Sequence, residues 1–280
     1  MNSTAMSSTQ DYPQLAFIGA GNMARSIIGG LVQEGYPPKR ISASDTKPEL
    51  LAQMATDFGI STGDNQQIAR AAEVVVLAVK PQVMSEVSRD LRPALEHQPL
   101  LISIAAGINS ASLNRWLGQA QALVRCMPNT PSLVRAGACG LYANARTSER
   151  QKVIAERIMS AVGLALWLDD EALLDSVTAV SGSGPAYFFL VMEAMIEAGV
   201  GLGLSRDKAT QLTLQTALGA AQLAQQSELP VAELRRRVMS PGGTTEAAIR
   251  SFEQDQLGEI FSRAMTACAQ RSASLAREFN

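Results

Sequence analysis

The residues of this chain best suited to chemistry lie in two glycine-containing segments, one near each end. The later segment is Ser240-Pro241-Gly242-Gly243-Thr244-Thr245, and a helical pattern follows it to Arg250. Glycines let a ligand approach the backbone closely, and the free N–H groups at the start of a helix favour an anion. With Thr244 or Thr245 as the N-cap, we expect a binding site for a carboxylate or phosphate. The same residues are also typical of an ordinary capped helix after a glycine turn.

Near the amino terminus, an apolar strand pattern at 15–18 leads into Gly19-Ala20-Gly21-Asn22-Met23-Ala24, which fits G-x-G-x-x-A. A helical pattern follows to Glu34, and a second strand pattern follows at 40–44. In this order the first glycine makes a tight turn and the second lets a pyrophosphate lie against the backbone. The small third residue permits close packing of helix on strand. The segment predicts a dinucleotide site, the alternative being a glycine turn that merely joins strand to helix.

The first half of the chain alternates strand and helix patterns, which predicts an α/β domain with a doubly wound parallel sheet of the Rossmann type. After the opening unit we expect helices at 48–58, 81–91, 110–117 and 149–162, and strands at 74–79, 100–104, 122–127 and 164–168. From Glu171 onward only helical patterns occur, at 171–179, 184–202, 205–226, 230–239, 245–254 and 257–279. We therefore expect a disordered tail at 1–11, a dinucleotide-binding domain at 12–170 and an all-α domain at 171–280 that mediates dimerisation.

Composition excludes several classes of protein. The net charge of −2 and the pI near 5.6 give no electrostatic basis for nucleic-acid binding. The 3 cysteines are odd in number and far apart, so we expect a reducing, cytoplasmic compartment and no metal site. Residues 185–204 are almost wholly apolar, but Glu193 and Glu197 lie in the middle. Burying each carboxylate at a bilayer centre would cost about 2.5–3.5 kcal/mol, so we expect no membrane span and a helix buried between subunits.

The only histidine, His97, lies in a polar stretch and is expected to be a solvated loop residue. With no other histidine in the sequence, we expect no Ser-His-Asp or Cys-His triad. Hydride transfer from a reduced nicotinamide is the chemistry that needs least from side chains. Strand ends should line the cofactor crevice. Three such loops are Ala78-Val79-Lys80-Pro81, Ile104-Ala105-Ala106-Gly107 and Met127-Pro128-Asn129-Thr130-Pro131. Loops of this kind also join strands to helices in many other proteins.

These segments together resemble the pyrroline-5-carboxylate reductase family. The glycine loop, the three strand-end loops, Ser181-Gly182-Ser183-Gly184-Pro185-Ala186-Tyr187 and the segment at 240–245 occur in the order and spacing of that family. The resemblance extends from about residue 14 to the C-terminal helix. It implies that NAD(P)H reduces the C=N bond of 1-pyrroline-5-carboxylate to L-proline, the last step of proline biosynthesis. It also implies an intertwined homodimer formed by the helical half, assembled in many relatives into larger rings such as a decamer.

On this resemblance, the late segment would hold the substrate's carboxylate. The residues implied are Ser240, Gly243, Thr244 and Thr245, through hydroxyl and backbone N–H donors. Thr245 is the candidate catalytic residue, with its hydroxyl near the imine nitrogen, and a water relay is the alternative. Lys80 and Glu228 match substrate-side positions. For Glu228 the alternative is a helix-end charge before a proline, and for Lys80 a salt bridge elsewhere.

The cofactor-side residues come from the glycine loop and from the strand ends. They are Gly19, Ala20, Gly21, Asn22, Met23, Ala24, Ser44, Asp45, Asn65, Ala78, Val79, Lys80, Pro81, Ile104, Ala105 and Ala106. Asp45 falls where an acid binds the ribose 2′-OH of NADH and repels the 2′-phosphate of NADPH. Lys47 offers a compensating charge two residues later. We therefore expect the protein to use both nucleotides.

Two other functions fit the sequence less well. A β-hydroxyacid dehydrogenase needs a lysine on the first helix of the second half, but the first lysine after Gly182 is Lys208. A non-catalytic NAD(P)-binding module would have no need of a second anion site. The favoured function requires the glycine loop and the 240–245 segment to face one pocket, with the help of a neighbouring protomer if needed.

Overall fold

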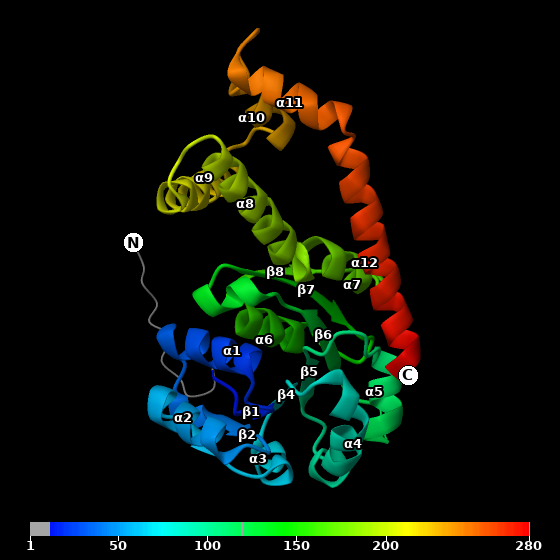
Figure 1. Cartoon of the computed structure of the whole chain (residues 1–280). Coiled ribbons are helices and arrows are strands. Elements are labelled where there is room, and N and C mark those ends of the chain that lie inside the picture. Colours follow the sequence, from blue (N-terminus) through cyan, green and yellow to red (C-terminus); the bar gives the residue numbers. More distant parts are fainter. Residues whose placement is uncertain (1–11, 119, 280) are drawn as a thin grey trace, which may run out of the picture. The chain divides into compact units, whose positions relative to one another are not determined.

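The structure is a computed structural model that describes residues 12–118 and 120–279 (Figure 1). The expectation of a disordered tail at 1–11 lies outside the described residues. The chain forms two compact units. The first contains the residues up to Ser183 together with those from Cys268 onward, and the second is Gly184–Ala267.

The first unit is built on one eight-stranded sheet in the order β3-β2-β1-β4-β5-β6-β7-β8. The strands are β1 (Leu15–Ile18), β2 (Ile41–Ser44), β3 (Ser61–Thr62), β4 (Val74–Leu77), β5 (Leu100–Ser103), β6 (Leu123–Met127), β7 (Gly137–Ala143) and β8 (Gly163–Trp167). Strands β1 to β6 are parallel, β7 is antiparallel to β6, and β8 is parallel to β7. The chain order reverses between β1 and β4, which is where ligands bind in open α/β sheets.

Helices cover both faces of this sheet (Figure 1). One face carries α1 (Asn22–Gln33), α2 (Pro48–Phe58) and α6 (Glu149–Ser160), and the other carries α3 (Asn65–Ala71), α4 (Pro81–Leu91) and α5 (Ser110–Leu117). Short 3₁₀ turns lie at Pro38–Arg40, Arg92–Ala94 and Thr130–Val134. The expected Rossmann-type α/β architecture is thus confirmed.

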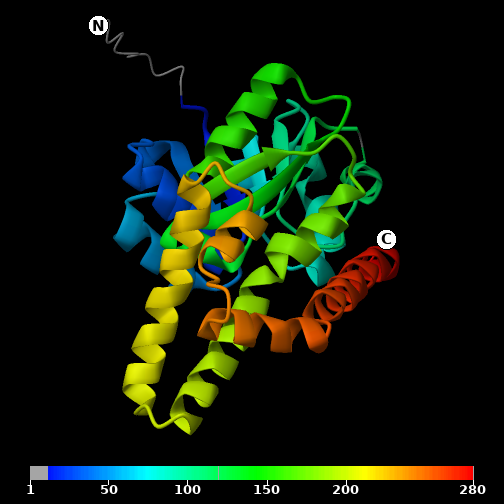
Figure 2. The same ribbon diagram turned by 90° about the horizontal axis from the view of Figure 1, so that it is seen from above.

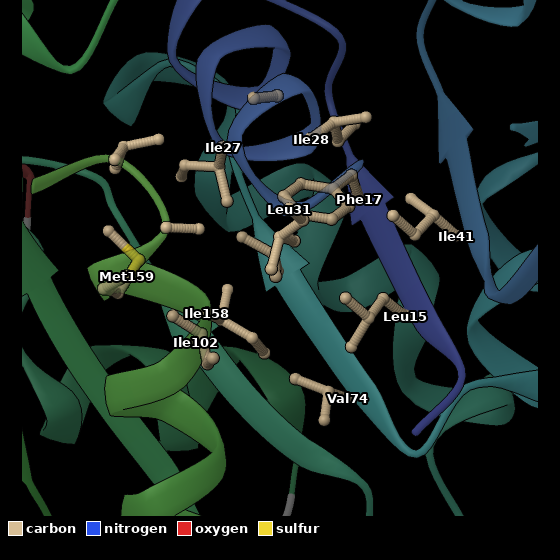
Figure 3. Packing of buried hydrophobic residues seen from close by; sticks show 14 of the residues in the cluster. Leu15, Phe17, Ile27, Ile28, Leu31, Ile41, Val74, Ile102, Ile158 and Met159 are labelled. Carbon is tan, nitrogen blue, oxygen red and sulfur yellow. The ribbon is translucent and has the colours of Figure 1, made fainter. Parts of the chain in front are cut away.

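The apolar strand residues alternate between two cores, as expected of strands buried on both faces. Leu15 and Phe17 of β1 pack on the α1 side, whereas Ala16 and Ile18 pack on the α4 side. Figure 3 shows the α1-side core, where Phe17 lies among Ile27, Ile28 and Leu31 of α1. These side chains are almost completely inaccessible to solvent, so the core fixes the positions of the strand ends.

Three elements were not expected from the sequence: β3, α3 and the antiparallel strand β7. The sheet is therefore mixed at one end rather than wholly parallel. The small residues of β7 give no apolar strand pattern in the sequence. Close packing requires them, because a Cβ at Gly137 would lie 2.3 Å from Ser132 Oγ and one at Gly140 would lie 2.8 Å from Val177 Cγ2. Strand β8 ends the sheet, and its Leu164 and Leu166 are 57% and 56% exposed.

The helix expected at 171–179 is instead α7 (Leu173–Val177) followed by a π-helical turn at Thr178–Gly182. Thr178 Oγ1 donates to Leu174 O, and Ser181 Oγ donates to Val177 O, so hydroxyls compete with the helical backbone bonds. This segment and the last turns of α12 (Leu257–Phe279) belong to the first unit, where Ser272 Oγ donates to Asp175 Oδ1 over 2.6 Å. The compact units are therefore divided after Ser183 and before Cys268, whereas the domain boundary was expected between residues 170 and 171.

The second unit contains α8 (Gly184–Gly201), α9 (Arg206–Gln226), α10 (Val231–Arg237), α11 (Thr244–Gln254) and the start of α12. Figure 2 shows α8 and α9 joined as an antiparallel hairpin. Close packing explains Gly199, because a Cβ there would lie 3.2 Å from the Cβ of Ala209. Arg206 donates two hydrogen bonds to the carboxylate of Glu197, which ties the two helices near their turn.

Helix α8 exposes a large apolar surface in the single chain. Phe188, Phe189 and Leu190 are each more than 60% exposed. Within the described residues, the continuous helical stretch Leu173–Gly201 is long and apolar enough to cross a membrane by length and composition, and 11% of its most apolar window is buried. An exposed apolar surface of this size is typical of an interaction site.

Candidate active site

The turn after β1 requires a glycine at position 19. Gly19 has a φ of +104°, and a Cβ there would lie 2.7 Å from the carbonyl oxygen of Ala78. Its N–H donates to the carbonyl of Ser44 over 2.8 Å. The turn is therefore held against the ends of β2 and β4, as the glycine pattern predicts.

Gly21 and the start of α1 fit a pyrophosphate. Gly21 is the N-cap of α1, and no side chain caps that end. A Cβ on Gly21 would meet no atom within 4 Å, so the space beside this backbone is open. The first N–H groups of a helix have no intrahelical acceptor, and here they face that space without competition from a capping side chain.

The other predicted strand-end residues line the same edge of the sheet. Ala78 N–H donates to Ile18 O over 2.8 Å, and Ile104 N–H donates to Leu77 O over 3.2 Å, so the loops after β1, β4 and β5 are adjacent. Lys80 is the exposed N-cap of α4, and Pro81 is the first residue of that helix. Ala105 is buried and Ala106 is exposed directly after β5. Ala78, Ala105 and Ala106 therefore present small side chains at this edge.

Asp45 and Ser44 connect the end of β2 to its neighbours. Asp45 Oδ2 accepts the N–H of Ala20 over 2.8 Å, and its Oδ1 accepts the N–H of Lys47 over 3.0 Å. Ser44 Oγ donates to Asn65 Oδ1 over 2.7 Å. The structure therefore brings the predicted cofactor-side residues Ser44, Asp45 and Asn65 to the glycine loop, and it gives Asp45 a second task as an anchor of that loop.

Asn129 lies in the loop after β6, and the sequence predicts no individual role for it. It is 8% exposed, its Nδ2 donates to Ser181 O over 3.0 Å, and its Oδ1 accepts the N–H of Ala138 over 2.9 Å. One amide thus joins the loop after β6, the start of β7 and the π-helical turn. The Met-Pro-Asn-Thr-Pro pattern was the only signal for it in the sequence.

Glu171, for which the sequence also predicts no role, connects α5 and β6 through one oxygen. Its Oε1 accepts the N–H of Ser110 over 2.7 Å, the Oγ–H of Ser110 over 2.9 Å and Arg125 Nη1 over 2.8 Å. Arg125 is 12% exposed in its side chain. The cluster fixes the start of α5 against β6, next to the loop that follows β5.

In the second unit, residues 240–245 form the turn that leads into α11 together with the first two residues of that helix, and we call this segment the corner. The expectation that Thr244 or Thr245 is the N-cap is wrong, because the N-cap is Gly243 and the two threonines are the first two residues of the helix. Gly243 N–H donates to Ser240 O over 2.9 Å, and Gly242 has a φ of +69°. The corner therefore turns through its glycines, and the threonine hydroxyls are not used as caps.

The structure gathers Ser240, Gly243, Thr244 and Thr245 in the corner, but it does not join the remaining predicted residues to them. Glu228 lies exposed between α9 and α10, and within the described residues no hydrogen bond or ion pair connects it to the corner. Lys80 and the glycine loop belong to the first unit and the corner to the second. That the two face one pocket stays a prediction.

Histidine and metal chemistry find no support in the described part of the chain. His97 is exposed in a loop, with Nε2 2.8 Å from Ala72 O. Among the described residues, no group of three or more His, Cys, Asp or Glu side chains is placed to hold a metal ion.

Comparison with known proteins agrees with this geometry. Residues 171–275 match the family described as pyrroline-5-carboxylate reductase dimerisation, and residues 14–107 match the family described as NADP oxidoreductase, coenzyme F420-dependent. The chain is 58% identical over 267 residues to the pyrroline-5-carboxylate reductase of Pseudomonas aeruginosa, which covers 95% of this chain and 98% of that protein. The chain belongs to the pyrroline-5-carboxylate reductase family.

Solved structures of pyrroline-5-carboxylate reductases share the fold. The enzyme from Coxiella burnetii superposes with a TM-score of 0.91 at 47% identity, covering 94% of this chain and 98% of that one. The enzyme from Plasmodium falciparum, determined with NADP bound, gives a TM-score of 0.83 at 29% identity over 94% of this chain and 98% of that one. As a member of the pyrroline-5-carboxylate reductase family, this protein is an NAD(P)-dependent oxidoreductase with a helical dimerisation domain.

Proposed function

We propose that the protein reduces the C=N bond of 1-pyrroline-5-carboxylate to L-proline, with the substrate's carboxylate at the corner and NAD(P)H at the carboxyl edge of the sheet. The 58% identity to a pyrroline-5-carboxylate reductase over 95% of the chain carries this assignment. The reaction is the last step of proline biosynthesis.

The cofactor, when bound, supplies a hydride to the C=N carbon. The pyrophosphate would lie against Gly21 and the start of α1, where the backbone is open and uncapped. The residues after β4 and β5 would flank the nicotinamide. Asp45, Ser44 and Asn65 would lie toward the adenosine ribose, at the end of β2.

The corner would bind the substrate's carboxylate through the hydroxyls of Ser240, Thr244 and Thr245 and the backbone N–H groups of the first helical turn, while Gly243, whose N–H donates to Ser240 O, shapes the turn. The positive end of the α11 dipole favours an anion at this position. Because the substrate has one carboxylate and one imine, binding the former at the corner fixes the direction of the latter.

Thr245 is the proposed catalytic residue. Hydride addition raises the electron density on the imine nitrogen, which must carry a proton in the product. If the imine arrives protonated, a hydroxyl is sufficient to orient it, and no strong acid is needed. A water relay is the competing proton donor. Lys80 and Glu228 are proposed as substrate-side charges, on the strength of their positions in the family pattern.

The helical half is proposed to form a homodimer, and dimers to assemble into a larger ring such as a decamer. The match to a dimerisation family over 171–275 and the exposed phenylalanines of α8 support this proposal. Covering α8 with a second copy accounts for its apolar surface without a membrane, and Glu193 and Glu197 in its middle favour the protein partner. With its three free cysteines, the protein is proposed to be cytoplasmic.

The assignment is tested by mixing the purified protein with NADPH and 1-pyrroline-5-carboxylate and following the absorbance of NADPH. L-proline should accumulate in step with cofactor oxidation. Oxidation of a β-hydroxyacid instead would favour the dehydrogenase alternative. Cofactor binding without turnover of either substrate would favour a non-catalytic module.

A further inference from the structure

A carboxylate of the chain itself supports the corner. Glu246 is the third residue of α11, and its Oε2 accepts the N–H of Gly242 over 2.5 Å. Its Oε1 accepts Arg250 Nη2 over 2.6 Å, one turn further along the helix. The side chain of Glu246 is 22% exposed, whereas that of Arg250 is 70% exposed. The carboxylate thus contacts the corner through one oxygen and the more exposed guanidinium of Arg250 through the other.

The contacts keep this carboxylate ionised. The hydrogen bond from Gly242 N–H, followed by the contact with Arg250, lowers the pKa of Glu246 from its ordinary value. An ionised acid in the first turn is also favoured by the helix dipole. At neutral pH the group is therefore an acceptor only, and the N–H of Gly242 is its donor.

The corner needs such support because its turn is made by two consecutive glycines. Gly242 has a φ of +69°, and glycine loses more conformational freedom on ordering than any other residue. The hydrogen bond from Gly243 N–H to Ser240 O closes the turn from one side, and the bond from Gly242 N–H to Glu246 closes it from the other. The arrangement resembles a capping box in which the third helical residue reaches back past the N-cap.

We propose that Glu246 is a positioning residue for substrate binding, which holds the Gly242–Gly243 turn in the shape that presents the amides and hydroxyls of Thr244 and Thr245 to the substrate's carboxylate. Arg250 neutralises Glu246, so that a fixed negative charge does not repel that carboxylate. The inference rests on the proposed function of the corner and adds two residues to it.

Two substitutions of Glu246 distinguish the effect of its side-chain length from the effect of its charge. Glu246→Gln removes the charge and keeps an oxygen that reaches Gly242 N–H, whereas Glu246→Asp keeps the charge and shortens the side chain so that it falls short. Positioning predicts that the Gln variant stays within about threefold of the wild-type KM for 1-pyrroline-5-carboxylate. The Asp and Ala variants should both show a KM raised about tenfold, which corresponds to about 1.4 kcal/mol, close to the lower limit for a hydrogen bond to a charged group. The kcat of all three variants and their KM for NADPH should change by less than about twofold.

The charge of Arg250 is tested in the same assay. Arg250→Met leaves Glu246 unneutralised and should raise the KM for the imino acid about threefold, and adding Glu246→Gln should restore it. Glu253→Ala is the matched control, because Glu253 lies on the same helix and pairs with Arg235 away from the turn, over 3.2 Å. Its KM should equal that of the wild type.

An Asp variant equal to the wild type with an impaired Gln variant would overturn the inference, because charge and not reach would then matter. An unchanged KM for 1-pyrroline-5-carboxylate in the Ala variant would overturn it as well. So would a fall in kcat and a rise in the KM for NADPH as large as the change in the KM for 1-pyrroline-5-carboxylate. In each of those cases the wild type still reduces 1-pyrroline-5-carboxylate. A wild type that does not would overturn the proposed function itself.

Discussion

The carboxylate of Asp45 accepts the backbone N–H of Ala20 over 2.8 Å and so joins the end of β2 to the glycine loop. Asp45→Ala should raise the KM for both NADPH and NADH by about 5- to 12-fold, because an unpaired amide in the loop costs about 1–1.5 kcal/mol. Initial-rate measurements with each nucleotide provide the check. A change in one KM alone would show that the aspartate acts on the ribose and not on the loop.

Asp45→Asn is the informative companion, because it keeps an oxygen for Ala20 and removes the charge. Its ratio of kcat/KM for NADPH over NADH should rise, since an acid at this place opposes a 2′-phosphate. For the wild type we expect a ratio below about a hundredfold, which corresponds to about 2.7 kcal/mol, with Lys47 offsetting the acid.

Thr245→Ala should lower kcat about 10²–10⁴-fold, the usual range for a group that handles a proton in the transition state. Thr245→Ser keeps the hydroxyl and should retain most of the activity. The control is Thr56→Ala, because the Thr56 hydroxyl donates only to Ala52 O on an exposed face of α2. Near-wild-type kcat/KM in the alanine variant would remove Thr245 from the mechanism and leave water as the donor.

Glu171→Ala should destabilise the protein by about 3 kcal/mol, because it leaves Arg125 largely buried without its partner. The melting temperature should fall by roughly 6–12 °C for a chain of this size. Thermal unfolding at one protein concentration measures the effect. Glu34→Gln, which breaks the exposed pair with Arg135, is the control and should cost less than about 1 kcal/mol. Equal effects of the two changes would contradict the structural role given to Glu171.

Of the three thiols, only that of Cys268 should react quickly with an aromatic disulfide reagent at pH 8. Cys126 and Cys139 are buried on neighbouring strands, and burial, with the adjacent Cys139 thiol, raises the pKa of Cys126 well above its ordinary value. Absorbance of the released thiolate counts the reactive groups before and after denaturation. Cys268→Ser should remove the fast phase, and two or more fast thiols in the native protein would refute this assignment.

The same shift makes stability depend on pH in a defined direction. The thiol of Cys126 is neutral in the folded state. Its contribution to the free energy of unfolding is therefore fully present below about pH 8.5, where the unfolded thiol is also protonated. Above that pH the unfolded chain ionises and the free energy of unfolding falls. Denaturant midpoints at pH 7 and pH 10 should differ less in Cys126→Ala than in the wild type.

Phe188→Glu should weaken self-association, because this phenylalanine is 67% exposed on α8 within the dimerisation match. Sedimentation should show a smaller particle than the wild type at the same concentration. Val153→Glu is the control, since Val153 is 65% exposed on α6, outside that match. An unchanged mass for the Phe188 variant would place the interface elsewhere.

The sequence was sufficient wherever local pattern and geometry agree. Gly19 makes the tight turn that the strand, turn and helix pattern predicts, and Gly21 precedes α1 as expected, whereas its contact with a pyrophosphate stays a prediction. The sequence does not predict strand β7, because its glycines are required by close packing against Ser132 and Val177. Such tertiary contacts leave no periodic pattern in the local sequence.

The residues that link separate elements could not be predicted, because their partners are distant in sequence. Asn129 and Ser181 are 52 residues apart, and Arg125 and Glu171 are 46 apart, so only the folded chain brings them together. The N-cap of α11 was misplaced for a different reason. Threonines next to a helix start suggested hydroxyl caps, but Gly243 is the N-cap, and the Glu246 carboxylate accepts the N–H of Gly242 just before it.

Strand β8 lies at the end of the sheet, and Leu164 and Leu166 are exposed along it. An edge that combines unpaired backbone groups with leucine side chains is a template for further strands from other molecules. Aggregation is then expected not only from the unfolded chain but also from a correctly folded first unit whose edge strand β8 is uncovered. Expression yield and shelf life should therefore depend on two leucines that have no part in catalysis.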